Sequence, residues 1–178
     1  MAARLEATGI PFMLTGSVAA AAYGAGRATM DIDLVIDATV DQLHALVRSL
    51  ASPDLYISAD AALEALEHES MFNVVEITTG WKADLIIRKS RPFSVTEFAR
   101  RRPIDFDGTH LHIATLEDVI IAKLEWAKLG GSARQIEDVT ALLRVAGDGV
   151  DRAYVDRWVT ELGLGVQWRA AQPTSETA

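Results

Sequence analysis

The alternation of hydrophobic and polar residues along the first half of the chain predicts strands separated by helices. Residues 11–15 (PFMLT) are nearly all apolar and predict a short buried strand. The chain then passes through Gly16 and Ser17 into the run VAAAAY, whose small side chains are typical of a helix packed closely on a sheet. We therefore expect the order strand, turn and helix at the start of the fold.

The next predicted strand covers residues 31–37 (DIDLVID). Because side chains alternate between the two faces of a strand, Asp31 and Asp33 share one face while the apolar Ile32, Leu34 and Ile36 share the other. A helix is expected after it, because the next residues combine a capping box with apolar residues at helical spacing: Thr39 and Gln42 for the box, then Val40, Leu43, Leu46, Val47 and Leu50. A second helix is expected over residues 59–67.

Two antiparallel hairpins are predicted in the middle of the chain. Residues 71–77 and 81–87 read as strands separated by a turn that contains Gly80, and Lys82 and Asp84 fall on one face of the second strand. A short helix is expected near residues 94–101. The second hairpin, formed by PIDF and THLHI, closes at the Asp107-Gly108 turn.

From Thr115 onward the pattern predicts helices only, with glycines where they should stop and a capping box at Ser132 and Gln135. We therefore expect an α/β (α+β) fold in which a mixed sheet is flanked by helices. The expected organisation is a core over residues 1–114, a helical region over residues 115–172 and a disordered tail over residues 173–178.

Composition and charge exclude several kinds of site and one class of protein. The chain has 178 residues, 49% of them hydrophobic, and no cysteine, which excludes disulfides and cysteine-based zinc or thiol chemistry. A net charge of −8 argues against a protein that coats duplex DNA. The window from Lys82 to Arg102 is the exception, with seven basic residues against two acidic ones. Such a window can meet a polyanion, or residues 100–102 can simply end a helix, whose C-terminal dipole favours cations.

The start of the chain lacks the basic residues and the long apolar run of a signal peptide, and no stretch reaches about 18 uninterrupted apolar residues. We therefore expect a protein that neither spans a membrane nor is secreted by that route. The absence of cysteine fits a reducing compartment. The expected location is the cytoplasm.

Asp31 and Asp33 are candidates for metal binding because they project two carboxylates from one side of a strand. Two such charges repel, and a divalent cation such as Mg²⁺ or Mn²⁺, which prefers hard oxygen ligands, would offset the repulsion. The simpler interpretation is a solvated strand end. Asp84 adds a third acid within an otherwise apolar strand, where it needs either a basic partner or a metal shared with the other two.

Gly16 and Ser17 stand at the predicted strand-to-helix turn, fourteen residues before Asp31. Glycine lets the backbone approach a ligand closely, and the N–H groups at a helix start with a serine hydroxyl can bind phosphate. A tight turn with a serine N-cap is the commoner use of such a pair. Three carboxylates on neighbouring strands beside a phosphate-binding turn match a two-metal arrangement for phosphoryl or nucleotidyl transfer.

The series of motifs resembles the GS…DxD…D signature of the DNA polymerase β-type nucleotidyltransferase superfamily: Gly16-Ser17, Tyr23-Gly24, Arg27, Thr29, Asp31-Ile32-Asp33 and Asp84. The later segment LEDVIIAKLEWAKLGGSARQIEDVTALL is similar to the helical part of its small bacterial members, which include the AbiEii-type toxins. The resemblance runs from about Pro11 to Leu143. Relatives usually carry a longer helix before the first strand, so we do not take Met1 as the established start of the natural chain.

The resemblance implies a role for each matching residue. Gly16, Ser17 and Arg27 would bind the nucleoside triphosphate, and Asp31 and Asp33 would bind the catalytic Mg²⁺, with Asp84 as the third metal-binding acid. Asp84 would also take the proton of the attacking hydroxyl.

In the AbiEii-like group, a lysine and a later aspartate of the helical part also belong to the catalytic site. Lys123 and Asp138 occupy the matching places here. The alternative is that Lys123 extends along an amphipathic helix and that Asp138 is a surface acid.

The expected function is Mg²⁺-dependent transfer of a nucleoside monophosphate from a triphosphate such as ATP to a hydroxyl acceptor, which can be an RNA, a protein or a small molecule. Two alternatives remain open. One is the toxin of a toxin–antitoxin pair that modifies RNA and has an antitoxin as its partner. The other is a non-catalytic nucleotide-binding module of the same fold.

Overall fold

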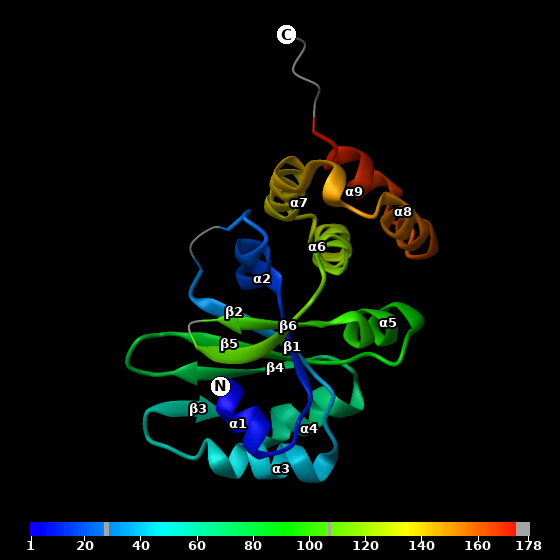
Figure 1. The fold of residues 1–178 in the computed structure, drawn as a ribbon. Coiled ribbons are helices and arrows are strands. Elements are labelled where there is room, and N and C mark those ends of the chain that lie inside the picture. The colour runs from blue at the N-terminus through cyan, green and yellow to red at the C-terminus, as the bar shows by residue number, and fades with distance from the viewer. Residues whose placement is uncertain (27–28, 107, 174–178) are drawn as a thin grey trace. The chain divides into compact units, whose positions relative to one another are not determined.

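The computed structural model describes residues 1–26, 29–106 and 108–173, which divide into two compact units (Figure 1). The first unit is built from residues 1–17 and 28–114, and the second from residues 18–27 and 115–178. Residues 18–27 thus group with the C-terminal helices although they follow the first strand of the sheet. Each unit is described by itself below.

The first unit contains a mixed sheet, which has seven strands within the described residues: β1 (Phe12–Thr15), β2 (Asp31–Ile36), β3 (Leu55–Ile57), β4 (Met71–Glu76), β5 (Lys82–Ile87), β6 (Arg102–Phe106) and β7 (Thr109–Ile113). Their order is β3-β4-β5-β2-β1-β7-β6. The pairs β2–β5 and β1–β7 are parallel, and the other neighbours are antiparallel. Both predicted hairpins are confirmed. The turn residue Asp107 lies outside the described residues.

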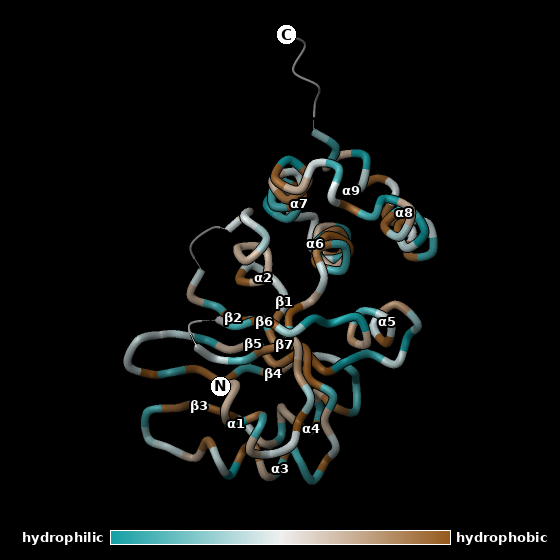
Figure 2. The backbone as a smooth tube through the Cα atoms, in the orientation of Figure 1, coloured by the Kyte–Doolittle hydropathy of each residue, from teal (hydrophilic) through white to brown (hydrophobic). Residues whose placement is uncertain are grey.

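Helices α1 (Ala2–Ala7), α3 (Val40–Ser49) and α4 (Ala59–Glu67) lie on one side of the sheet in Figure 1, and α5 (Pro92–Arg100) follows β5. Helix α4 packs on β4, β5 and α3. Figure 2 shows the hydrophobic stretches running through the strands. The sheet therefore buries one apolar face under helices, as the alternation of residues 31–37 predicts.

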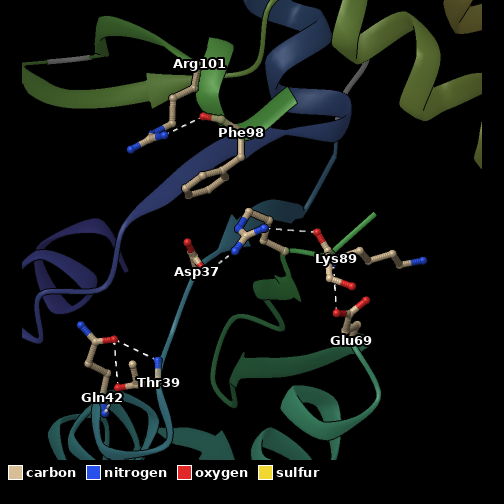
Figure 3. Close-up of polar contacts among 9 residues, drawn as sticks. Asp37, Thr39, Gln42, Glu69, Lys89, Phe98 and Arg101 are labelled. Carbon is tan, nitrogen blue, oxygen red and sulfur yellow. Dashed lines mark hydrogen bonds and ion pairs between the residues drawn. The ribbon is translucent and has the colours of Figure 1, made fainter. Parts of the chain in front are cut away.

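The start of α3 carries the predicted capping box. The Thr39 side chain accepts from the backbone N–H of Gln42, and the Gln42 side chain accepts from the backbone N–H of Thr39 (Figure 3). The Gln42 amide also donates to the carbonyl oxygen of Gly9. The capping box thus pairs two backbone N–H groups at the start of α3, and Gln42 also ties the helix to the segment before β1.

The second unit consists of helices α6 (Leu116–Gly130), α7 (Ala133–Ala146), α8 (Arg152–Glu161) and α9 (Gly165–Ala170), with a short 3₁₀ turn, η1 (Gly147–Gly149). Helix α6 contacts α7, α8 and α9 and forms the centre of the unit. Helix α2 (Gly16–Ala22) begins in the first unit and continues into residues of the second. The left-handed Gly131 ends α6 as predicted.

One predicted cap is wrong. Ser132 stands at the N-cap of α7 but its side chain forms no capping hydrogen bond. The Gln135 side chain, expected to complete the box, instead accepts from the Nζ of Lys123 at 3.1 Å. The physical reason is that a buried ammonium needs acceptors more than an exposed helix end does, because water can satisfy the latter.

A buried polar cluster joins α6 to α8. Asp118 is fully buried and accepts from the Thr115 hydroxyl at 2.6 Å and from the Tyr154 hydroxyl at 2.7 Å. Thr115 is the N-cap of α6, so the cluster fixes both the start of α6 and its contact with α8. Within the described residues, no helix is long and apolar enough to cross a membrane.

Candidate active site

Three carboxylates lie on one face of the sheet where β2 and β5 run parallel. The register pairs Asp33 with Asp84, and it pairs Asp31 with Lys82. Residues that are partners in register project to the same face, so Asp31, Asp33, Lys82 and Asp84 form one group, which we call the acid cluster. Asp31 is half exposed, whereas Asp84 is 7% exposed.

The backbone at Gly16 closes one side of the acid cluster. Strand β1 ends at Thr15, which pairs with Asp33, and the next residue, Gly16, has a φ of +65°. A Cβ atom at this position would lie 1.9 Å from the Oδ2 of Asp33. Only glycine therefore allows both this backbone conformation and the close approach of the Asp33 carboxylate.

Asp84 has partners within the sheet. The Nζ of Lys82 lies 3.1 Å from its Oδ2, and the side-chain amide of Asn73, which is its register partner in β4, donates to its Oδ1. Lys82 also lies 3.7 Å from the Oδ1 of Asp31. The sequence leaves two compensations open for this buried acid, a basic partner or a shared metal. The structure contains the basic partner, Lys82.

The acid cluster holds Lys82 in its charged form. Burial lowers the pKa of Lys82, but the hydrogen bond to Asp84 and the negative charges of Asp84, Asp31 and Asp33 outweigh it. The net result is a pKa above the ordinary value for lysine. Lys82 is therefore an ammonium across the physiological range, and this contribution to folded-state stability disappears only as the pH rises through that elevated pKa.

Two buried hydroxyl groups border the cluster. Thr15 shares the face of Asp33, and its Oγ1 is buried without a hydrogen-bond partner among the described residues. Ser17 is 8% exposed and follows Gly16 at the start of α2. Leaving the Thr15 hydroxyl buried without a partner is costly, and a ligand at this face would satisfy it.

The chemistry of these side chains fits a hard divalent cation, since carboxylate and hydroxyl oxygens are the ligands that Mg²⁺ and Mn²⁺ prefer. In the part of the chain that the structure describes, no group of three or more His, Asp or Glu side chains is arranged to hold a metal ion. Asp31 and Asp84 are separated by the ammonium of Lys82. A metal ligated by both would need that ammonium to move.

Lys123 and Asp138 are brought together within the second unit. The Nζ of Lys123 lies 2.7 Å from the Oδ2 of Asp138, and both residues are buried, at 3% and 9% exposure. The interpretation of Asp138 as a surface acid is therefore wrong. A buried ion pair that also holds Gln135 has a structural use in joining α6 to α7, whatever further role the two residues have.

Arg27 lies outside the described residues, so its expected contact with the nucleotide stays a prediction. The basic window is largely engaged within the protein. Besides Lys82, Arg88 pairs with Asp37 at 3.1 Å, and Arg101 lies over the ring of Phe98 and donates to its carbonyl oxygen (Figure 3). Helix α5 ends at Arg100, as the helix-end interpretation of these arginines predicts.

Sequence reasoning identified the three aspartates and the glycine but assigned no role to Lys82, Asn73 or Thr15. Lys82 and Asp84 are two residues apart, so their shared face is visible in the sequence. Asn73 interrupts the apolar pattern of its strand, between Phe72 and Val74, which is a signal for a polar partner on that face. The contact of Thr15 with this face depends on the pairing of β1 with β2.

The chain is similar to known proteins in its three-dimensional structure but not detectably in its sequence. No family model matches the chain, and no curated protein matches it in sequence. Among solved structures, the solution structure of the antibiotic-resistance factor ANT(2'')-Ia is similar over 94% of this chain and 92% of its own, with a TM-score of 0.57 and 13% identity. Its crystal structure in complex with adenylyl-2''-tobramycin has a TM-score of 0.57 and 14% identity over 90% and 94% of the two chains.

A third similar structure is the antigenic nucleotidyltransferase-like protein from Paracoccidioides brasiliensis. It matches 98% of this chain and 91% of its own, with a TM-score of 0.56 and 18% identity. Similarity at 13–18% sequence identity shows a shared fold and leaves the function open to test. The chain has the α+β fold of nucleotidyltransferases.

Proposed function

We propose that the protein is a nucleotidyltransferase that transfers a nucleoside monophosphate from a nucleoside triphosphate to a hydroxyl acceptor, with Mg²⁺ or Mn²⁺ as its metal. The observation that carries the proposal is the register of β2 and β5, which aligns Asp31, Asp33 and Asp84 on one face beside the backbone of Gly16. The shared fold of ANT(2'')-Ia supports it.

Six residues have an assigned role in the proposed reaction. Asp31 and Asp33 hold the divalent cation, and Gly16, Ser17 and Arg27 bind the phosphates. A bound divalent cation supplies neutralisation of the phosphate charge. Asp84 accepts the proton of the acceptor hydroxyl, whose oxygen forms a bond to the α-phosphorus while the bond to pyrophosphate breaks. Asp84 retains lone pairs for that proton beside its contacts with Lys82 and Asn73.

The acceptor class with an observation in its favour is a small molecule. The crystal structure of ANT(2'')-Ia contains adenylyl-2''-tobramycin, a nucleotide-modified small molecule, in a protein of this fold. The basic window does not favour a toxin that modifies RNA and has an antitoxin partner, because several of its cations contact other groups of the protein. A small-molecule acceptor and ATP as donor are therefore part of the proposal.

The test is transfer of label to an acceptor. The whole protein is incubated with Mg²⁺, each α-labelled nucleoside triphosphate in turn, and either a small-molecule or a macromolecular fraction of cell extract. We expect label from ATP in the small-molecule fraction. The double variant Asp31→Asn with Asp33→Asn should lose transfer, whereas the matched variant Asp54→Asn with Asp60→Asn, which changes two exposed acids, should keep it.

Label in an RNA would show that the acceptor is RNA and would favour the alternative of an RNA-modifying toxin. Transfer that survives loss of both Asp31 and Asp33 carboxylates would overturn the proposed site. Absence of transfer from every triphosphate to every fraction, with the protein folded, would favour the non-catalytic nucleotide-binding module.

A further inference from the structure

Lys82 occupies a position within the acid cluster that a metal ion would otherwise take. Its Nζ lies 3.1 Å from the Oδ2 of Asp84 and 3.7 Å from the Oδ1 of Asp31. A Mg²⁺ ion binds carboxylate oxygens at about 2.0–2.1 Å. An ion that bridged these two oxygens would therefore fill the space in which the ammonium now lies.

Asp84 is also held by neighbours that donate to both of its oxygens. Lys82 contacts Oδ2 and the amide of Asn73 contacts Oδ1. Asp84 is 7% exposed, whereas the side chain of Asp31 is 51% exposed. The carboxylates differ accordingly: Asp84 is engaged inside the sheet, while Asp31 is open to a cation from solution.

The net charge of the acid cluster also favours a single divalent cation. Three carboxylates carry three negative charges, and the ammonium of Lys82 neutralises one of them. The two that remain are balanced by one divalent cation. In the absence of nucleotide, a second divalent cation would make the cluster positive, with an ammonium close to both ions.

We propose that Lys82 is a resident cation that takes the place of a second metal ion between Asp31 and Asp84, so that the acid cluster binds one divalent cation, through Asp31 and Asp33. This inference rests on the proposed function because it assumes a metal at Asp31 and Asp33. It changes the expectation of two metal ions shared by three acids. It also makes Lys82 a positioning residue, which holds Asp84 in place and limits metal binding.

The test counts metal ions. The whole protein is titrated with Mn²⁺ alone at neutral pH, and free Mn²⁺ is followed by electron paramagnetic resonance. Lys82→Gln removes the positive charge and keeps an amide that can donate to Asp84. Lys89→Gln makes the same change of charge at an exposed lysine after β5 and serves as the control.

We expect one bound Mn²⁺ in the wild type and in Lys89→Gln. In Lys82→Gln we expect either a second ion or an affinity for the first that is higher by at least about tenfold, because a positive charge next to the site is gone. A merely structural ion pair would lower the melting temperature of Lys82→Gln without changing the number or affinity of bound ions.

Two bound ions in the wild type would overturn the inference, as would a Lys82→Gln protein that binds Mn²⁺ as Lys89→Gln does. In the second case one ion still binds, so the proposed function stands. No Mn²⁺ bound by any of the three proteins would remove the metal site and the inference together. If circular dichroism shows that Lys82→Gln is unfolded, Lys82→Arg replaces it: the retained charge should keep one ion, and a second ion would overturn the inference.

Discussion

Substitutions of Asp84 and Ser17 should have different effects, one on catalysis and the other on nucleotide binding. Asp84 is assigned to the acceptor proton, so Asp84→Asn should lower the turnover number by about 10²–10⁴-fold and change nucleotide affinity little. Ser17 is assigned to the phosphates of the bound substrate, so Ser17→Ala should weaken nucleotide binding itself. Steady-state kinetics with the identified acceptor, together with nucleotide titration, measure both effects. Wild-type turnover in Asp84→Asn would show that another group accepts the proton.

Gly16 should tolerate substitution less than other glycines with a positive φ. Gly16→Ala combines that backbone conformation with a contact of 1.9 Å to the Asp33 carboxylate. Gly80, in the turn between β4 and β5, has a φ of +75° and its nearest neighbour for a Cβ is 4.0 Å away. Gly80→Ala should therefore cost about 1–2 kcal/mol in the free energy of unfolding, and Gly16→Ala about 1–3 kcal/mol more.

Urea denaturation followed by circular dichroism measures this difference. Equal losses for the two variants would mean that the Asp33 carboxylate moves aside without cost. Such a result would remove the argument that the backbone of Gly16 fixes the position of Asp33.

Among the elements, the contact of α6 with α7 depends on a buried charge pair. Lys123→Met would leave the Asp138 carboxylate buried without its cation, and the free energy of unfolding should fall by about 3–5 kcal/mol. Replacing both residues, with Lys123→Met and Asp138→Leu, should restore most of the loss because no charge stays buried. The control Lys128→Met changes an exposed lysine of the same helix. A loss in Lys123→Met no larger than in Lys128→Met would contradict the burial of the pair.

The starts of α3 and α7 give a second comparison between elements. Thr39 makes both hydrogen bonds of its capping box, so Thr39→Ala should lower the free energy of unfolding by about 1 kcal/mol. Ser132 caps nothing with its side chain, so Ser132→Ala should change it by less than about 0.5 kcal/mol. Thermal and chemical denaturation of the two variants measure the difference. Similar losses would mean that the Ser132 hydroxyl does cap α7 in solution.

Most elements could be predicted from the sequence because they have a clear period. Strands β2 and β5 alternate polar and apolar residues over positions 31–33 and 82–84 before an apolar run, and the helix over 59–67 has the predicted bounds. Strand β3 and helix α1 could not, since three and six residues are too short to show a period. The cap at Ser132 was mispredicted because its partner, Gln135, is used by Lys123 from a neighbouring helix.

The candidate site was predictable in part for a similar reason. The spacing of Asp31 and Asp33 shows that they share a face, and the spacing of Lys82 and Asp84 shows the same. That these two pairs lie side by side depends on β5 joining the sheet beside β2, across about fifty intervening residues. Such long-range pairing has no signal in a local pattern, so the ion pair of Lys82 with Asp31 could not be foreseen.

At the scale of the whole molecule, charge limits the polymers that the protein can bind. The net charge is −8, and Lys82 and Arg88 of the basic window are paired with acids of the protein, so the positive field available to phosphates is weak. Binding to duplex DNA at physiological salt should therefore be weaker than the range of about 10⁻⁴–10⁻⁶ M that is usual for non-specific binding. Fluorescence anisotropy with a labelled duplex measures it. Tighter binding that weakens steeply with salt would show that the basic window is available after all.

The candidate site can form only if β2 and β5 pair in the correct register. A slip of one residue in this pairing would turn Asp84 toward the helices on the apolar face and turn Leu85 toward the acids. Burial of Leu34, Ile36, Leu85 and Ile87 opposes such a slip. The hydrophobic residues on the far side of the sheet thus decide where the carboxylates lie, and a misregistered molecule would lose its chemistry together with its stability.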